Sequence, residues 1–292
     1  MEIIRSKENR LTKIIKSLSS KKGREDNKLF ILEGPKVVLE AMDSDFEIFA
    51  ICLREDIYEK AVLDDLNYSW LNNEILLFEN GDSKFKVCVI QKDIFDILSL
   101  TENSQGVMSL IKIKNDKEVI REIEALMESD FCFIVLDEIK DPGNMGTIIR
   151  TAEAFGIEGI IVGKGSVDVF NDKVIRSTMG SILRMPVLQI ENLKVFLLDL
   201  KGKGVQIIGA DPHSETDFRK VEKAAKTVIV IGNEAKGISE DIRECLSIAV
   251  NIPMSGRAES LNAGIAAALM AYEFNSQEYV KLKIIDKKQK EE

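Results

Sequence analysis

The chain has 292 residues, 45% of them hydrophobic and 30% charged, a composition typical of a globular protein with a substantial core. Its length predicts about two domains. No uncharged stretch reaches the ~20 residues of a membrane-spanning helix, and the charged start argues against a signal peptide. The net charge of −9 argues against indiscriminate binding to nucleic acid, although residues 1–28 carry nine basic and four acidic side chains.

Histidine and cysteine usage narrows the chemistry further. His213 is the single histidine, and the four cysteines are scattered without a CxxC pair. We therefore expect no zinc finger, no histidine-based catalysis and no bound metal. Cys88 and Cys132 lie in apolar runs, which predicts reduced core residues of a cytoplasmic protein.

The first half of the chain predicts a basic amphipathic helix followed by a small α/β unit. Over residues 5–18 apolar side chains recur at helical spacing opposite basic ones, which indicates either the solvated face of a packed helix or a phosphate-binding face. Strands are expected at 28–34, 47–53, 74–78, 85–90 and 107–113, with helices at 35–42 and 93–100. The charged stretch 114–128 predicts a linker helix.

The second half predicts a parallel sheet with helices on both faces. The nearly unbroken apolar runs at 131–137, 159–163, 206–211 and 227–232 are typical of strands covered on both sides, and helical patterns separate them. These helices are expected at 145–155, 171–179, 193–201 and 239–246. A last helix over 260–274 is apolar nearly all round, which predicts burial in the core or in a subunit interface.

Three segments at strand ends of this half carry candidate functional residues. In the first, Asp141 to Gly156, the pattern predicts Asn144 as a helix cap and Arg150 on the side opposite an apolar stripe. A cap and a solvated cation explain both residues. Their place after a parallel strand also favours a ligand site, because open α/β sheets bind ligands at the carboxyl ends of their strands.

The second and third segments follow later strands. Val228 to Ile242 contains a loop with two glycines, followed by Ser239 as a predicted helix cap. It matches neither a P-loop nor GxGxxG, and no acidic ribose-binding residue follows at the expected distance, which argues against a dinucleotide enzyme. Asn251 to Phe274 places Glu259 among polar residues at the start of the last helix, and a capping cluster is the simplest interpretation.

Taken together and in this order, the three segments resemble the signature motifs of the SpoU (TrmH-type) family. Its members are S-adenosyl-L-methionine-dependent RNA ribose 2′-O-methyltransferases of the SPOUT class. The resemblance rests on Asn144 and Arg150 with five residues between them, then IGNEAKG, then IPMSGRAESLN. More loosely, KLFILEGPKVVLEA and TENSQGVMSL resemble the family's small N-terminal substrate-binding domain.

The resemblance implies a fold, a cofactor and a set of site residues. The fold is an α/β parallel sheet with helices on both faces and a C-terminal deep trefoil knot. The residues that would hold S-adenosyl-L-methionine are Gly232, Asn233, Ile252, Met254 and Leu261. The residues that would serve catalysis are Asn144, Arg150, Glu234, Ser260 and Asn262.

The family implies Arg150 at the reacting hydroxyl, sometimes as its base. Because arginine stays protonated, we interpret Arg150 as a cation that binds the flanking phosphate and stabilises the emerging oxyanion. Asn144 and Ser260 would fix the ribose or Arg150, Asn262 would support its loop, and Glu234 would hold Arg150 or the knot loop. No metal is needed.

These inferences predict a cytoplasmic, homodimeric ribose 2′-O-methyltransferase of structured RNA, with ribosomal RNA favoured over transfer RNA by the extra N-terminal domain. The alternatives are a transfer RNA methyltransferase and a non-catalytic RNA-binding or assembly protein on the same fold. The expected domains are 1–113 with the basic helix and the RNA-binding α/β unit, the linker 114–128, the methyltransferase domain 129–280 and a charged tail 281–292.

Overall fold

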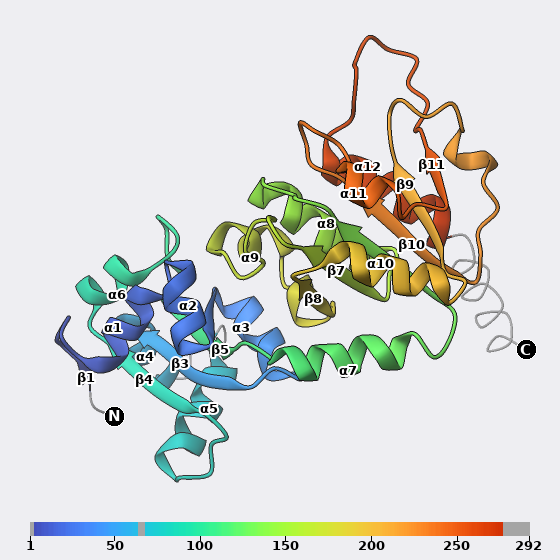
Figure 1. The fold of residues 1–292 in the computed structure, drawn as a ribbon. Coiled ribbons are helices and arrows are strands. Elements are labelled where there is room, and N and C mark those ends of the chain that lie inside the picture. Colours follow the sequence, from blue (N-terminus) through green and yellow to red (C-terminus); the bar gives the residue numbers. More distant parts are fainter. Residues whose placement is uncertain (1–2, 64–67, 277–292) are drawn as a thin grey trace, which may run out of the picture. The chain divides into compact units, whose positions relative to one another are not determined.

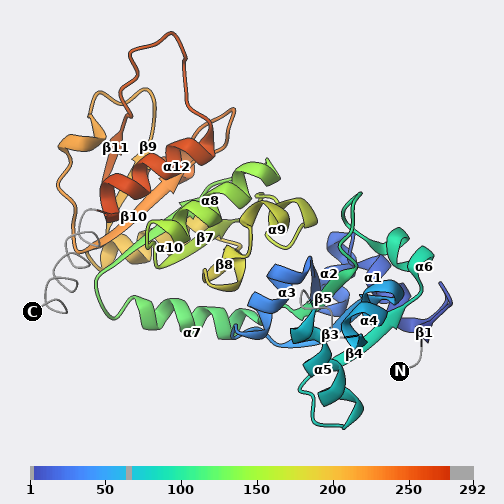
Figure 2. The ribbon, with the colours of Figure 1, turned by 180° about the vertical axis from the view of Figure 1, so that it is seen from behind.

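The computed structural model describes residues 3–63 and 68–276, so the predicted charged tail 281–292 lies outside the described residues. The chain forms two compact units (Figures 1 and 2). The first comprises Met1–Lys114 and Phe170–Arg176, and the second comprises Asn115–Val169 and Ser177–Glu292. In the described ranges no helix is both long and apolar enough to cross a bilayer.

The first unit is built on a mixed sheet that, within the described residues, has five strands in the order β1-β4-β3-β5-β2. β5 runs antiparallel to both β2 and β3, whereas β1, β3 and β4 are parallel. The strands are β1 (Ile3–Ile4), β2 (Leu29–Glu33), β3 (Ile48–Arg54), β4 (Lys86–Ile90) and β5 (Val107–Lys112). The helices are α1 (Arg10–Ser17), α2 (Lys21–Asn27), α3 (Pro35–Met42), α4 (Glu55–Val62), α5 (Ser69–Glu79) and α6 (Lys92–Leu98), with α9 (Asp172–Thr178) beginning in this unit.

Two predicted elements of this unit were wrong. Residues 74–78 form part of helix α5 and not a strand, because Leu71 and Ile75 are one helical turn apart and both are buried. The basic helix begins at Arg10 rather than at residue 5. Asn9 caps it by accepting a 2.9 Å hydrogen bond from the Leu11 amide, and β1 precedes it.

The second unit contains the predicted parallel sheet. Its described strands number six, in the order β11-β9-β10-β6-β7-β8, and every pairing is parallel. They are β6 (Phe131–Leu136), β7 (Gly159–Gly163), β8 (Val187–Ile190), β9 (Gln206–Ala210), β10 (Lys226–Ile231) and β11 (Ile248–Val250). The helices are α7 (Asp116–Leu126), α8 (Pro142–Ala154), α10 (Leu193–Gly202), α11 (Glu240–Arg243) and α12 (Ala263–Ala271).

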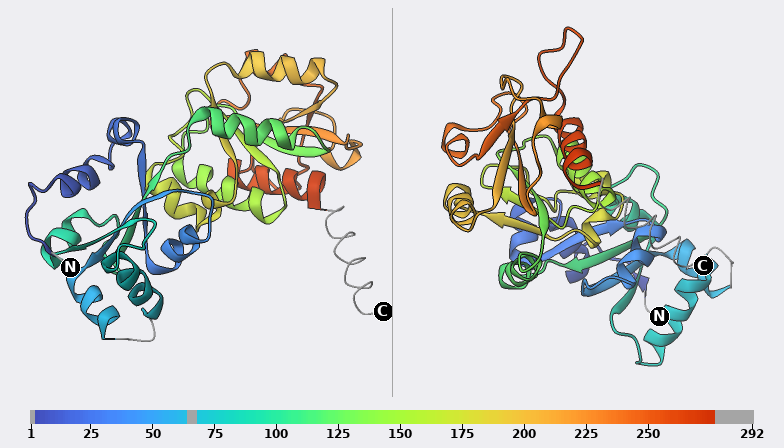
Figure 3. Two further views of the ribbon diagram at one scale, coloured as in Figure 1. Left: turned by 90° about the horizontal axis from the view of Figure 1, so that it is seen from below. Right: turned by 90° about the vertical axis from the view of Figure 1, so that its right-hand side faces the viewer.

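The central strands β6 and β10 are buried on both faces, which explains their unbroken apolar sequences. Helices α7 and α10 cover one face of the sheet, and α8 and α12 cover the other (Figure 3). The last helix is shorter than the predicted 260–274: α12 begins after its cap Asn262, and a wider π-helical turn (Tyr272–Ser276) follows it. Its burial is also incomplete, because Ile265 and Tyr272 are half exposed.

Candidate functional site

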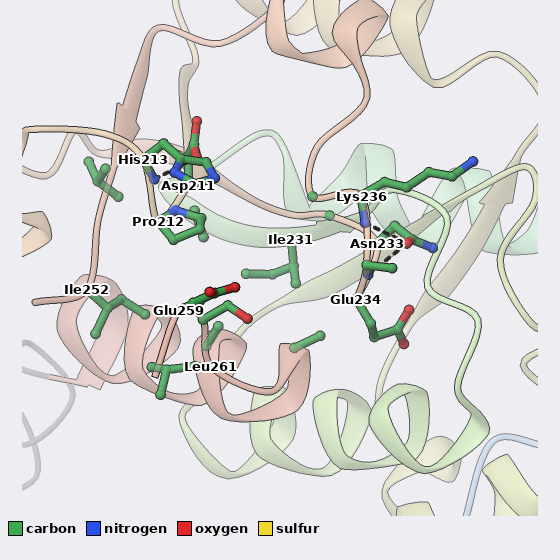
Figure 4. Close-up of a pocket in the computed structure, with 18 of the residues that line it drawn as sticks. Asp211, Pro212, His213, Ile231, Asn233, Glu234, Lys236, Ile252, Glu259 and Leu261 are labelled. Carbon is green, nitrogen blue, oxygen red and sulfur yellow. Dashed lines mark hydrogen bonds between the residues drawn. The ribbon is translucent and has the colours of Figure 1, made fainter. Parts of the chain in front are cut away.

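A cavity of about 270 Å³ lies in the second unit, at the carboxyl ends of β9, β10 and β11. Three segments far apart in the sequence form its walls (Figure 4). Asp211, Pro212 and His213 follow β9 on one side, and the loop 232–237 follows β10 on the other. The chain from Ile252 to Leu261, between β11 and α12, completes the lining. Open parallel sheets bind ligands at this edge.

The loop after β10 is a tightly hydrogen-bonded turn. The backbones of Asn233 and Gly237 exchange two hydrogen bonds of 3.0 and 2.9 Å, and the Asn233 side chain accepts from the Ala235 and Lys236 amides. A Cβ atom at Gly232 would lie 2.3 Å from the backbone of Gly237. Glycine is therefore required at position 232, because the two ends of the turn touch there.

A hydrogen-bond chain joins this loop to α8 and α12. Asn144 Nδ2 donates to Glu234 Oε1 at 2.9 Å, and Asn262 Nδ2 donates to Asn144 Oδ1 at 2.7 Å. Glu234 also accepts from the backbone amides of Lys140 and Asp141 at 3.2 and 3.1 Å. The three sequence motifs are thus bonded to one another through side chains that lie beside the cavity.

The predicted capping role of Asn144 is wrong. Asp141 is the N-cap of α8 and accepts from the Asn144 amide at 2.8 Å, so the Asn144 side chain is free to bind Glu234. The helix begins three residues earlier than expected, because Pro142 occupies its first turn. Ser239 stands at the N-cap of α11 without a side-chain capping bond, whereas Asn262 does cap α12.

Charged groups face the cavity from several segments. Burial alone would raise the pKa of Asp211, but the Arg243 guanidinium and the His213 amide bind its carboxylate, and the net effect lowers the pKa. Burial likewise opposes ionisation of Glu234, yet the hydrogen bonds from Asn144 and the backbone lower its pKa. Both carboxylates are therefore held in the ionised form at neutral pH.

The predicted site residues fall into three groups. Those that line the cavity are Gly232, Asn233, Ile252, Met254, Leu261, Glu234 and Ser260. Asn144 and Asn262 stand behind the lining and act on it through the hydrogen-bond chain. Arg150 does not line the cavity: it is exposed on α8, and its side chain forms no hydrogen bond or ion pair with another residue of the described ranges. Glu234 therefore binds Asn144 and the loop 140–141, not Arg150.

Sequence reasoning missed the segment after β9. Asp211, Pro212 and His213 line the cavity, and Arg243 on α11 and Glu259 join them. His213 lies outside the three motif segments in the sequence, and the structure brings it to the site. A signal existed, because Asp211 ends the buried strand run QIIGAD at the carboxyl edge that also carries the motifs.

The lining fits S-adenosyl-L-methionine. Apolar walls from Ile231, Ile252 and Leu261 suit the adenine ring and the thioether carbons, and the backbone of the turn 232–237 offers polar groups for its edge. The lining carboxylates Asp211, Glu234 and Glu259 outnumber the cations Lys236 and Arg243, which suits a molecule with a net positive charge. Across the described ranges no cluster of histidine, cysteine or acidic side chains could hold a metal ion.

Comparison with known proteins shows which families the two halves of the chain resemble. The SpoU rRNA Methylase family matches residues 132–272, and the MRM3-like substrate binding domain matches residues 9–109. The 23S rRNA (guanosine(2553)-2′-O)-methyltransferase RlmP of Bacillus subtilis is 29% identical over 273 residues, which cover 93% of this chain and 98% of the relative.

Two further relatives are similar over most of their length. A protein of Staphylococcus saprophyticus assigned to the TrmH family of tRNA/rRNA methyltransferases is 31% identical over 253 residues, 86% of this chain and 97% of the relative. The crystal structure of an AdoMet-bound rRNA methyltransferase from Sinorhizobium meliloti aligns with a TM-score of 0.76 at 26% identity, covering 93% of this chain and 96% of that one.

Proposed function

The chain belongs to the SpoU rRNA methylase family, and from this premise we propose that it methylates a ribose 2′-hydroxyl of structured ribosomal RNA. It is an S-adenosyl-L-methionine-dependent RNA methyltransferase. The observation that carries this function is the single cavity at the strand ends, where the motif loops meet and where Asn144, Glu234 and Asn262 are bonded in series. A non-catalytic RNA-binding protein would not require this arrangement beside a cavity with this lining.

The residues that would hold the cofactor are Gly232, Asn233, Ile252, Met254 and Leu261, all in the lining. The bound cofactor supplies a methyl sulfonium that is already reactive toward an oxygen nucleophile. What the protein must add is alignment of the ribose oxygen and stabilisation of its developing negative charge. The rigid turn at 233–237 serves the first need, because its backbone is fixed by hydrogen bonds before any ligand arrives.

Arg150 serves the second need. Its cationic guanidinium lowers the pKa of a hydroxyl placed beside it and stabilises the alkoxide that remains when the hydroxyl proton passes to solvent water, while its remaining N–H groups bind the flanking phosphate. Ser260, in the lining, is placed to bind the ribose. Asn144 and Asn262 are positioning residues, since they tie the first turn of α8 to the cofactor loops through Glu234.

We propose that the active protein is a homodimer formed through α12 and α8. Ile265 and Leu269 on α12 and Tyr272 directly after it expose apolar surface. α12 packs on α8, and burying such surface favours association. Arg150 is exposed on α8 and absent from the lining of its own cavity. In a dimer, the arginine of one copy would complete the site of the other.

We also propose the trefoil knot of the SPOUT class. It is supported by the path of the chain after β11, which lies at one edge of the sheet, to α12, which packs on α8 and on the central strand β10. In this arrangement the loops after β10 and β11 lie on two sides of the cofactor cavity and line it together.

Ribosomal RNA is the preferred substrate in this proposal, because the relative RlmP is named for 23S rRNA and the first unit matches a substrate-binding domain. The exposed cations of α1, Arg10, Lys13 and Lys16, would bind phosphates. Arg24 does not belong to this surface: it is buried and donates to the Leu18 carbonyl at 2.7 Å. A ribosomal RNA substrate implies that the protein acts in the cytoplasm.

The proposal is tested by titration calorimetry and by methylation mapping. We expect the full-length protein to bind both S-adenosyl-L-methionine and S-adenosylhomocysteine with micromolar affinity. Ribose methylation mapped in cellular RNA, with and without the protein, should then differ at a discrete position of ribosomal RNA. Binding of neither compound would favour the non-catalytic alternative. If the position that loses its methyl group in cells without the protein lies in transfer RNA, transfer RNA is the substrate instead of ribosomal RNA.

A further inference from the structure

The first unit contains a second large hollow, far in sequence from the cofactor motifs. It measures about 1050 Å³, at the upper end of the sizes usual for ligand pockets. It lies between the start of the chain, the beginning of α1, the strands β3 and β4, and the end of α5. We call it the Phe49 groove and define it by Ile4, Arg5, Arg10, Phe49, Phe78 and Lys86.

Phe49 is an unusual residue for its strand. All other residues of β3 are buried except the last, Arg54, yet the Phe49 side chain is 38% exposed. The pairing of β3 with β5 is irregular at this point, because the register shifts between Ile48 and Ala50. Such an irregularity re-aims the side chain at which it occurs. The aromatic ring is thus presented to the groove and not to the core.

The charge of the groove is opposite to that of the protein. Arg5, Arg10 and Lys86 line it, and no described residue of the lining is acidic, whereas the chain as a whole carries −9. Arg5 pairs with Glu55 at 3.2 Å. Neither Arg10 nor Lys86 forms an ion pair with another residue of the described ranges, so both are available to an anionic ligand.

A smaller hollow of about 360 Å³ adjoins the Phe49 groove and continues it. The two share Phe49, Phe78 and Lys86, and the smaller hollow adds the cation Lys84 from the turn before β4 and the ion pair of Glu47 with Lys112. Aromatic rings and cations therefore line both hollows. This combination is the one that proteins use for unpaired nucleotides, where bases stack on aromatic rings and cations follow the phosphates.

We propose that the Phe49 groove captures an unpaired nucleotide of the RNA substrate, with its base stacked against Phe49 and Phe78 and its phosphates bound by Arg10 and Lys86. This inference rests on the proposed function, because it supposes an RNA substrate. It assigns to the first unit a preference for a bulged, looped or flanking single-stranded base rather than for a regular helix. The cations alone would bind both forms of RNA.

The test measures binding of the full-length protein to two labelled RNAs, a ten-residue oligoadenylate and a fully paired hairpin without unpaired flanks, by fluorescence anisotropy. We expect Phe49→Leu and Phe78→Leu to lower affinity for the oligoadenylate at least about tenfold, the scale of one lost stacking contact, and to leave hairpin affinity within twofold. Arg10→Gln and Lys86→Gln should weaken both RNAs. Leu77→Ala on α5 and Lys60→Gln on α4 are matched controls outside the groove and should change neither.

A second measurement does not depend on the folding of any variant. An oligonucleotide with 5-iodouridine, irradiated on the parent protein, should crosslink to the peptides that contain Phe49 or Phe78. Equal affinity of the parent and both phenylalanine variants for oligoadenylate, or crosslinks only elsewhere, would overturn the proposal. Calorimetry with S-adenosyl-L-methionine on the same samples separates this outcome from failure of the proposed function, because none of these residues lines the cofactor cavity.

Discussion

The side chains of Asn144 and Glu234 form a 2.9 Å hydrogen bond across 90 residues of sequence, and this bond ties the first turn of α8 to the loop 232–237. Asn144 is 8% exposed, so its amide cannot turn to water when Glu234 is removed. We expect Glu234→Ala to cost about 1–3 kcal/mol of unfolding free energy, the penalty for an unsatisfied buried polar group. Asn144→Ala should cost a similar amount, and the double variant less than the sum. Urea unfolding of the four proteins measures the coupling, and strictly additive losses would contradict a direct interaction.

The same carboxylate makes stability depend on pH. The pKa of Glu234 is lower in the folded protein than its ordinary value of 4.5, so ionised Glu234 stabilises the fold. This contribution is fully present above pH 4.5 and is lost as the pH falls through the lowered folded value. Unfolding midpoints of the parent and of Glu234→Gln should therefore differ at pH 7 and converge on acidification. If the difference between the two unfolding midpoints grows toward low pH, ionised Glu234 does not stabilise the fold.

Gly232 is the position where a single methyl group should abolish the cofactor site. An added Cβ would lie 2.3 Å from the backbone carbons and nitrogens of Gly237 and Ile238, and backbone cannot step aside as a flexible side chain can. We expect Gly232→Ala to cost at least about 1–3 kcal/mol of stability and to weaken S-adenosyl-L-methionine binding more than tenfold by calorimetry. Gly202→Ala, at the end of α10 with open space around it, is the matched control and should leave binding unchanged.

Arg150 should separate chemistry from cofactor binding. Because it lies outside the cavity lining, Arg150→Ala is expected to leave the affinity for S-adenosyl-L-methionine within twofold of the parent. Methyl transfer should fall about 100- to 1000-fold, the usual loss when one oxyanion-stabilising donor is removed. Arg150→Lys, which keeps the charge but not the forked geometry, should recover part of the rate. Arg121→Ala on α7 is the control for an exposed arginine, and equal loss in both variants would remove Arg150 from the mechanism.

The basic surface of α1 should govern the salt dependence of RNA binding. Each phosphate contact contributes about 0.7–0.9 to the slope of log K against log salt, so replacing Arg10, Lys13 and Lys16 by glutamine should flatten the slope by about two or three. Filter binding at four salt concentrations measures it. Lys13 already pairs with Glu8 at 2.6 Å and should contribute least. Lys203→Gln on the second unit is the control, and an unchanged slope in the triple variant would make α1 a purely structural helix.

The fold of the second unit was largely predictable because its central strands are buried on both faces. Their apolar runs leave little choice of element, and turn residues separate them from the helices. β8 (Val187–Ile190) was not predicted, because it is four residues long, pairs only with β7 and is half exposed. Residues 74–78 were misassigned because the four-residue apolar run at 75–78 fits either element, and Leu71, which fixes the helical period, lies outside that run.

The site was predictable where one short segment supplies the residue. Gly232 and Asn233 belong to a single turn, and both line the cavity. The role of Asn144 was not predictable from local sequence. A capping residue and a residue that binds Glu234 look the same in sequence, and only the tertiary structure distinguishes the two roles. Asp211 and His213 were missed although Asp211 ends a buried strand run, because the sequence does not show that β9 lies directly beside β10 and β11.

The bond from Asn262 to Asn144 has a consequence for biosynthesis. Translation delivers α8 long before the start of α12, so a nascent chain that has emerged only to β10 possesses the sheet centre but lacks the wall from Ile252 to Leu261. We therefore expect a nascent chain to retain the methyl donor only after the segment from Ile252 to Leu261 has left the ribosome and folded. Chains that end before this segment should neither sequester the cofactor nor modify RNA.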